Sequence, residues 1–243
     1  MNSFYNRLTT SLIGMDGGNI KAPLWVSGLE WAGYDEEITS KVTRPTYEVD
    51  GHKVPYLSDE WKASTPNFYK WQFDQKVAKI LCRAFDYQGE YKDYMKEKYC
   101  SSSSNEFKLN LFPLPCRNVN DWQKQHIELT STKIKYHYQT HCSITRFFLF
   151  NQLVKQFNPK VVLCFGQRFI EEYKMAFCGA YDTNSFHLEE YKLGSGKSRV
   201  KILTSDIFPT LVIAPFLGRN LVANSELEEL GSIIAKYLSL PTT

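Results

Sequence analysis

The chain has 243 residues, of which 43% are hydrophobic and 23% are charged. This composition excludes a disordered chain and fits one large α/β domain. No run of eighteen apolar residues occurs, so we expect no membrane-spanning helix and no membrane partner, and the first residues lack the pattern of a signal peptide. A formal charge of +3 permits a nucleic-acid partner without requiring one.

The six cysteines are scattered, and no two of them have the CxxC spacing of a zinc or iron–sulfur site. We therefore expect free thiols in a reducing, cytoplasmic compartment, with no metal and no cofactor. Aromatic residues make up 15% of the chain and could supply stacking surfaces for bases, although most are expected in the core. The sequence does not specify an oligomeric state.

The N-terminal part of the chain predicts one short helix, one buried strand and one longer helix. Apolar residues at helical spacing predict a helix over residues 2–13. Residues 23–28 form an apolar run that ends at glycine, which predicts a buried strand. Residues 41–60 contain proline and glycine breakers and are expected to be irregular. Pro66 suits the first turn of a helix over residues 66–86.

The middle of the chain predicts three further helices and two further strands. The helices are expected over residues 90–99, 120–130 and 143–157. Residues 107–112 predict a strand, which the prolines that follow would stop. Residues 160–166 predict another strand, because an unbroken apolar run is typical of a parallel strand buried on both faces.

The C-terminal part predicts two helices separated by two strands. These elements cover, in chain order, residues 167–177, 200–203, 210–214 and 225–238. Ser225 is the expected N-cap of the last helix, and Glu228 is its expected capping-box partner three residues later.

The order of these elements indicates the fold class. Strands alternate with helices, which is typical of α/β proteins. We expect a three-layer α/β/α sandwich with a central, mostly parallel sheet. The chain has no internal repeat and no clear linker, so we expect residues 1–243 to form a single domain with a partly helical insertion at about 40–105.

Three loops follow predicted strands and carry the most distinctive residues. They cover residues 28–37, 110–118 and 214–224. In parallel sheets, ligands bind where loops leave the carboxyl ends of the strands. We therefore expect these loops to form the functional site.

The first loop, GLEWAGYDE over residues 28–36, resembles the water-activating motif of the uracil-DNA glycosylase superfamily. In that family a strand ends in glycine, and an acidic or amide residue follows shortly. The resemblance implies that Glu30 is catalytic and orients the attacking water. It also implies that Gly28, Trp31 and Tyr34 contact the substrate base. The proline of the family motif is absent here.

The second loop begins with LNLFP, residues 109–113, and resembles the strand whose asparagine reads the Watson–Crick edge of a flipped base in that family. The resemblance implies that Asn110 is this residue and that Phe112 belongs to the same substrate site. Asn110 could instead pin backbone turns, because a buried amide must find hydrogen-bond partners.

The third segment, IAPFLGRN over residues 213–220, resembles the loop that normally reads His-Pro-Ser and contacts DNA. The resemblance implies DNA contacts from Leu217, Gly218, Arg219 and Asn220. In the family, the histidine stabilises charge on the departing base. Here Ala214 precedes the proline, and a shifted register would place Phe216 at the position of the histidine, so the usual electrophile is absent.

The resemblance covers about residues 20–38, 107–120, 142–170 and 210–238. It implies a DNA glycosylase-like protein that hydrolyses the N-glycosidic bond of a deaminated or modified, uracil-type base in DNA. Such an enzyme flips the base out of the stack, aims a water at the sugar and stabilises the departing base.

Alternatives to this function stay open. A catalytically inactive or repurposed module could keep the fold and bind DNA, a base or a nucleotide. An unrelated α/β hydrolase or transferase is a third interpretation. At the residue level, Glu30 could be a solvated loop residue, and Trp31 and Tyr34 could simply anchor their loop onto the core.

Overall fold

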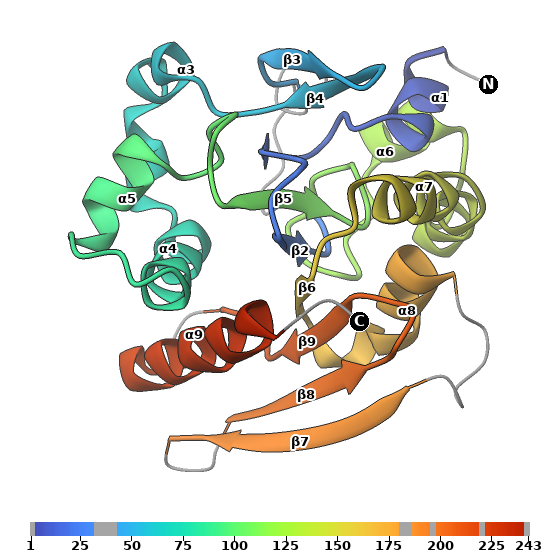
Figure 1. The fold of residues 1–243 in the computed structure, drawn as a ribbon. Helices are drawn as coiled ribbons and strands as arrows, with labels where there is room; N and C mark the ends of the chain where they lie inside the picture. Colours follow the sequence, from blue (N-terminus) through green and yellow to red (C-terminus); the bar gives the residue numbers. More distant parts are fainter. Residues whose placement is uncertain (1–2, 32–42, 180–185, 195–197, 219–221, 241–243) are drawn as a thin grey trace.

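The computed structural model describes residues 3–31, 43–179, 186–194, 198–218 and 222–240 (Figure 1). Within these ranges, seven strands form one sheet in the order β1-β5-β2-β6-β9-β8-β7. Their bounds are β1 Gly17–Gly18, β2 Leu24–Gly28, β5 Glu106–Asn110, β6 Val161–Phe165, β7 His187–Leu193, β8 Ser198–Thr204 and β9 Thr210–Ala214. The four central strands, β5, β2, β6 and β9, are parallel, and β1, β8 and β7 pair antiparallel at the edges.

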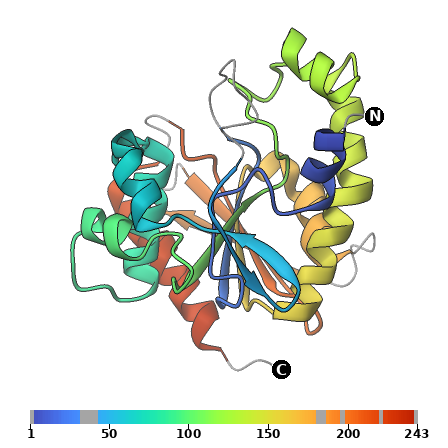
Figure 2. The ribbon, with the colours of Figure 1, turned by 90° about the horizontal axis from the view of Figure 1, so that it is seen from above.

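Helices cover both faces of this sheet (Figure 2). Their bounds are α1 Ser3–Thr10, α3 Asp59–Ser64, α4 Gln72–Ala84, α5 Tyr91–Glu97, α6 Lys124–Thr130, α7 Lys135–Phe157, α8 Ile170–Cys178 and α9 Asn224–Ser239. One core lies between the sheet and α4, α5 and α9, and the other lies between the sheet and α1, α7 and α8. The protein is therefore α/β, and its layers are compatible with a three-layer sandwich. In the ranges given above, no helix combines the length and the apolarity needed to cross a membrane.

The apolar central strands serve both cores because neighbouring side chains point to opposite faces of a sheet. In β2, Leu24 and Val26 pack on the side of α4 and α9, whereas Trp25 packs on the side of α7 and α8. All five residues of β2 and of β6 are buried. The sequence therefore predicted both strands correctly, β2 as a buried strand that ends at glycine and β6 from its unbroken apolar run.

The expectation that residues 41–60 are irregular was wrong. Strands β3 (Thr46–Val49) and β4 (His52–Pro55) form an antiparallel hairpin, and α3 follows. The hairpin turns at Asp50 and Gly51, whose φ angles are 48° and 81°. An Asp-Gly pair is a strong hairpin signal because both turn residues need a positive φ.

Several other element boundaries differ from the sequence expectations. Residues 66–86 were expected to form one helix. They form two, a 3₁₀ helix over Pro66–Lys70 and then α4, with a break at Trp71. Helix α7 begins at Lys135, eight residues before the expected start at 143. Strand β7 was not expected. The last helix begins at Asn224 instead of after Ser225, because the Glu226 carboxylate accepts the backbone N–H of Ala223 at 2.8 Å.

The segment expected as an insertion, at about 40–105, connects β2 to the adjacent parallel strand β5. It contains α4, which packs against α9 and supplies Val77, Ile80 and Leu81 to one of the two cores. This segment therefore provides the crossover connection that a parallel pair requires.

Candidate functional site

The first two predicted loops leave neighbouring parallel strands at the same edge of the sheet and run side by side. The backbone N–H of Leu111 donates to the Gly28 carbonyl at 3.1 Å, and that of Phe112 donates to the Leu29 carbonyl at 2.8 Å. Further along, the Cys116 N–H donates to the Trp31 carbonyl at 3.0 Å. These bonds continue the pairing of β2 and β5 beyond the sheet and fix the first loop against the second.

The third loop reaches the same place from β9. The ammonium of Lys76, on α4, donates to the Gly218 carbonyl at 2.7 Å and holds this loop against the helix. Phe216 is 45% exposed, and its ring centroid lies 6.3 Å from that of Phe73. Leu217 is buried in the core beside α4 and α9. Among the described residues of this loop, Phe216 is therefore the exposed apolar side chain.

A cavity of about 820 Å³ lies between the three loops. The predicted site residues that line it are Gly28, Glu30, Trp31, Asn110, Leu217 and Gly218. The segment between β2 and β5 adds Arg44, Trp61, Trp71, Phe73 and Asp74. A second hollow, of about 910 Å³, lies between α4 and the start of α9, and none of the predicted site residues that the structure describes lines it.

Glu30 is an ion-paired carboxylate in the wall of this cavity. The ammonium of Lys135, the first residue of α7, lies 2.8 Å from each carboxylate oxygen, and the Glu30 side chain is only 8% exposed. Oε1 accepts a hydrogen bond from Lys135, and Oε2 is a buried atom that forms the ion pair with the same ammonium. Burial raises the pKa of Glu30 above its ordinary value, and Lys135 opposes this effect. The solvated-loop interpretation of Glu30 therefore does not fit the structure.

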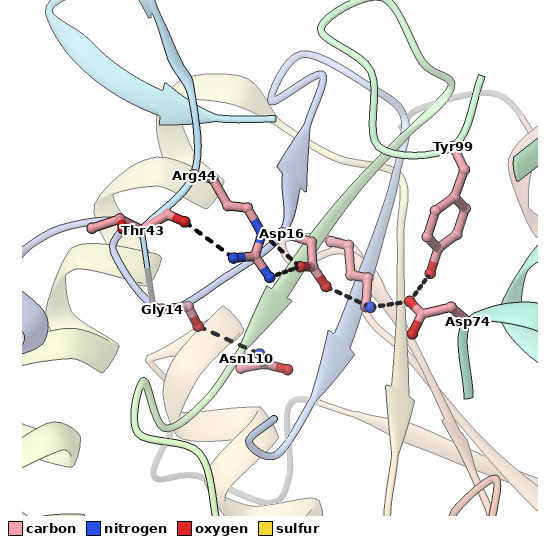
Figure 3. Close-up of polar contacts among 8 residues, drawn as sticks. Gly14, Asp16, Thr43, Arg44, Asp74, Tyr99 and Asn110 are labelled. Carbon is pink, nitrogen blue, oxygen red and sulfur yellow. Dashed lines mark hydrogen bonds and ion pairs between the residues drawn. The ribbon is translucent and has the colours of Figure 1, made fainter. Parts of the chain in front are cut away.

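Asn110 ends β5 and faces the cavity with a buried amide. Its nitrogen lies 3.4 Å from the Gly14 carbonyl (Figure 3). With the amide turned over, its oxygen accepts the indole N–H of Trp31 at 3.0 Å and its nitrogen donates to the Leu109 carbonyl at 3.2 Å. This second orientation satisfies both polar atoms of the amide. A Cβ at Gly28 would lie 2.7 Å from this amide, so a larger residue there would displace the Asn110 side chain.

Aromatic side chains form another wall of the cavity. The guanidinium carbon of Arg44 lies 4.3 Å from the ring centroid of Trp31 and 4.6 Å from that of Trp61. The guanidinium also donates two hydrogen bonds, at 3.2 and 2.9 Å, to one oxygen of Asp16. Trp71 contacts Trp61 edge-on at the mouth of the cavity and is 39% exposed. These indoles offer stacking surface for a planar ligand.

A row of buried charges forms one side of the cavity (Figure 3). Lys108, on β5, lies between Asp16 and Asp74, donating to Asp16 at 2.7 Å and to the nearer oxygen of Asp74. The Tyr99 hydroxyl also donates to Asp74, at 2.8 Å. Sequence reasoning missed this row. Its only sequence signal is the alternation of Glu, Lys and Asn with apolar residues along β5, which places all three polar side chains on one face.

The remaining predicted site residues lie elsewhere or outside the described ranges. Phe112 is absent from the described lining of the cavity and packs in the core against Tyr138 and Phe147. Tyr34, Arg219 and Asn220 lie outside the described residues.

The chain was compared with protein families and with curated proteins. It matches no family model and no curated protein. Over the described ranges, no group of three or more His, Cys, Asp or Glu side chains could hold a metal ion. The site is therefore interpreted from its own residues.

Proposed function

We propose that this protein is a DNA glycosylase-like enzyme that hydrolyses the N-glycosidic bond of a deaminated or modified, uracil-type base. One observation carries the proposal: a buried carboxylate, Glu30, and a buried amide, Asn110, line the same cavity at the carboxyl ends of parallel strands. Aromatic side chains beside them suit a planar base, and mildly basic overall charge suits a DNA partner.

In this proposal Glu30 orients and deprotonates the attacking water. Lys135 lies 2.8 Å from both carboxylate oxygens and fixes the group in the wall of the cavity, where it would accept a hydrogen bond from the attacking water. The raised pKa of Glu30, caused by burial, makes it a stronger base than an exposed carboxylate. The glycosidic bond breaks with its electron pair on the base, the water oxygen bonds to the sugar carbon, and the water proton passes to Glu30.

A second candidate, a module that binds DNA, a base or a nucleotide without cleaving it, is favoured by two observations. The Asn110 amide can be satisfied within the protein by Trp31 and Leu109, so a base would have to compete for it. The third loop has no histidine, and Ala214 is fully buried at the end of β9. We keep this module as the alternative outcome of the experiment below.

The test is an excision assay on single- and double-stranded oligonucleotides that carry uracil, hypoxanthine or xanthine, followed by alkali. We expect strand cleavage by the native protein and a loss of at least about 100-fold in Glu30→Gln. Because this neutral substitution leaves Lys135 without its counter-charge, the double variant Glu30→Gln/Lys135→Met is measured too. The control is Glu128→Gln, which removes an exposed ion pair with Lys124 and should cleave normally.

Two results would contradict parts of this proposal, the first the enzymatic activity and the second the role of Glu30. Binding of these oligonucleotides without cleavage, weakening with salt, would support the binding module. Full cleavage by folded Glu30→Gln would show that Glu30 takes no part in the reaction.

A further inference from the structure

The ammonium of Lys108 is a buried cation that lines the candidate site. Lys108 is 4% exposed and lies on the same face of β5 as Asn110, two residues away. Successive residues on one face of a strand are about 7 Å apart, so a base held beside Asn110 would lie close to Lys108. The cavity thus contains a positive charge, although its third loop has no histidine.

Two carboxylates fix the position of this ammonium and leave one of its hydrogens unused. A lysine ammonium has three N–H donors. Asp16 accepts one of them at 2.7 Å, and Asp74 accepts another. Among the described residues, no acceptor takes the third. The rings of Phe73 and Tyr99, with centroids 5.3 and 5.7 Å from Nζ, border the same ammonium.

Lys108 stays charged in this setting. Burial alone would lower the pKa of Lys108, but the carboxylates of Asp16 and Asp74 outweigh burial and raise this pKa above its ordinary value. Arg44 compensates Asp16 in turn, through an ion pair at 2.9 Å. The row of two acids and two bases is therefore neutral overall, and it presents a fixed hydrogen-bond donor that needs no rearrangement during a reaction.

We propose that Lys108 is a catalytic residue of this site, whose third N–H stabilises the negative charge on the departing base. This inference rests on the proposed function. As the glycosidic bond breaks, its electron pair moves onto the base, and Lys108 donates a hydrogen bond to the oxygen that carries this charge. Lys108 keeps its proton. The base anion is protonated from solvent, while the proton of the attacking water leaves through Glu30.

The test compares single-turnover excision of uracil with excision of 5-fluorouracil from the same single-stranded oligonucleotide. The fluorinated base is more acidic, so its anion needs less stabilisation when the glycosidic bond breaks. We expect Lys108→Met to slow uracil excision by at least about 100-fold, the usual effect of removing such a donor. The loss on 5-fluorouracil should be several-fold smaller, and Lys108→Arg should restore part of the uracil activity. Binding of the oligonucleotide, measured by fluorescence anisotropy, should be unchanged.

Two further variants separate chemistry from folding. Lys108→Met leaves Asp16 and Asp74 undercompensated, so Lys108→Met/Asp74→Asn, which preserves the overall charge, is measured beside it. Tyr99→Phe removes a hydrogen bond to Asp74 but leaves the ammonium, and it should retain activity within a few-fold.

The outcomes distinguish the two proposals. If the native protein excises both bases and the Lys108 variants lose equal activity on each, Lys108 has a structural role and only this inference fails. If the Lys108 variants keep full activity, the inference fails in the same way. If the native protein excises neither base, the proposed function fails, and the role of Lys108 fails with it.

Discussion

At the scale of single residues, the ion pair of Glu30 and Lys135 predicts how excision depends on pH. Burial raises the pKa of Glu30, and the neighbouring ammonium of Lys135 lowers it. A general base must be ionised, so kcat/KM should rise with pH through this pKa and then level off. In Lys135→Met the opposing ammonium is gone, so the acid limb should move to higher pH. A pH–rate profile of both proteins measures this shift, and an unmoved or downward-shifted limb would contradict the role of the pair.

The site residues that the sequence predicted lie at strand ends, whereas those that it missed depend on partners far away along the chain. Glu30 and Asn110 could be found because Glu30 follows β2 and Asn110 ends β5, and the carboxyl ends of parallel strands carry sites. Lys108 and its partners could not be found in this way. A buried lysine needs carboxylates, and its two partners, Asp16 and Asp74, lie 92 and 34 residues away along the chain. A single sequence does not indicate that Lys108 pairs with these two distant carboxylates; the fold is needed to show it.

At the scale of elements, two glycines with nearly equal backbone angles give a matched test of packing. Gly17 has a φ of 80° and Gly51 has a φ of 81°. A Cβ at Gly17 would lie 1.7 Å from the Pro55 carbonyl oxygen, whereas a Cβ at Gly51 would meet nothing within 4 Å. Gly51→Ala should therefore lower the free energy of unfolding by about 1 kcal/mol, the cost of the left-handed conformation.

Gly17→Ala adds a steric clash to the same backbone cost. It should lower the free energy of unfolding by at least about 2 kcal/mol more than Gly51→Ala, because β1 must move away from β4. Urea unfolding of the two variants measures this difference. Equal effects would mean that the hairpin does not pack against β1 as described.

Elements with strong local patterns were predicted, and those that depend on distant partners were not. Strand β6 is apolar throughout and β2 opens with three apolar residues, so their burial is visible in the sequence. Strand β7 lies at the sheet edge, pairs only with β8 and is largely exposed, so it carries no comparable apolar run. The first turn of α7 has no strong apolar pattern, and its Lys135 forms an ion pair with the distant Glu30.

At the scale of the whole molecule, the crossover between β2 and β5 links the fold to the site. Helix α4 belongs to the core on one face of the sheet, and its first turn places Phe73 and Asp74 in the cavity wall. The same segment contributes Arg44, Trp61 and Trp71. The resemblance in sequence indicated the three loops, but it had no counterpart for this segment, so this part of the cavity wall emerged only from the fold.

The most direct test of the central claim is a crystal structure of Glu30→Gln bound to an oligonucleotide that carries uracil. We expect the uracil to lie out of its base stack, in the cavity between Trp31 and Phe73. Its carbonyl oxygens should lie within hydrogen-bond distance of Lys108 or Asn110. A water should lie between the substituted side chain and the sugar carbon. A bound oligonucleotide whose uracil stays outside this cavity would contradict the proposed function and the roles of these residues.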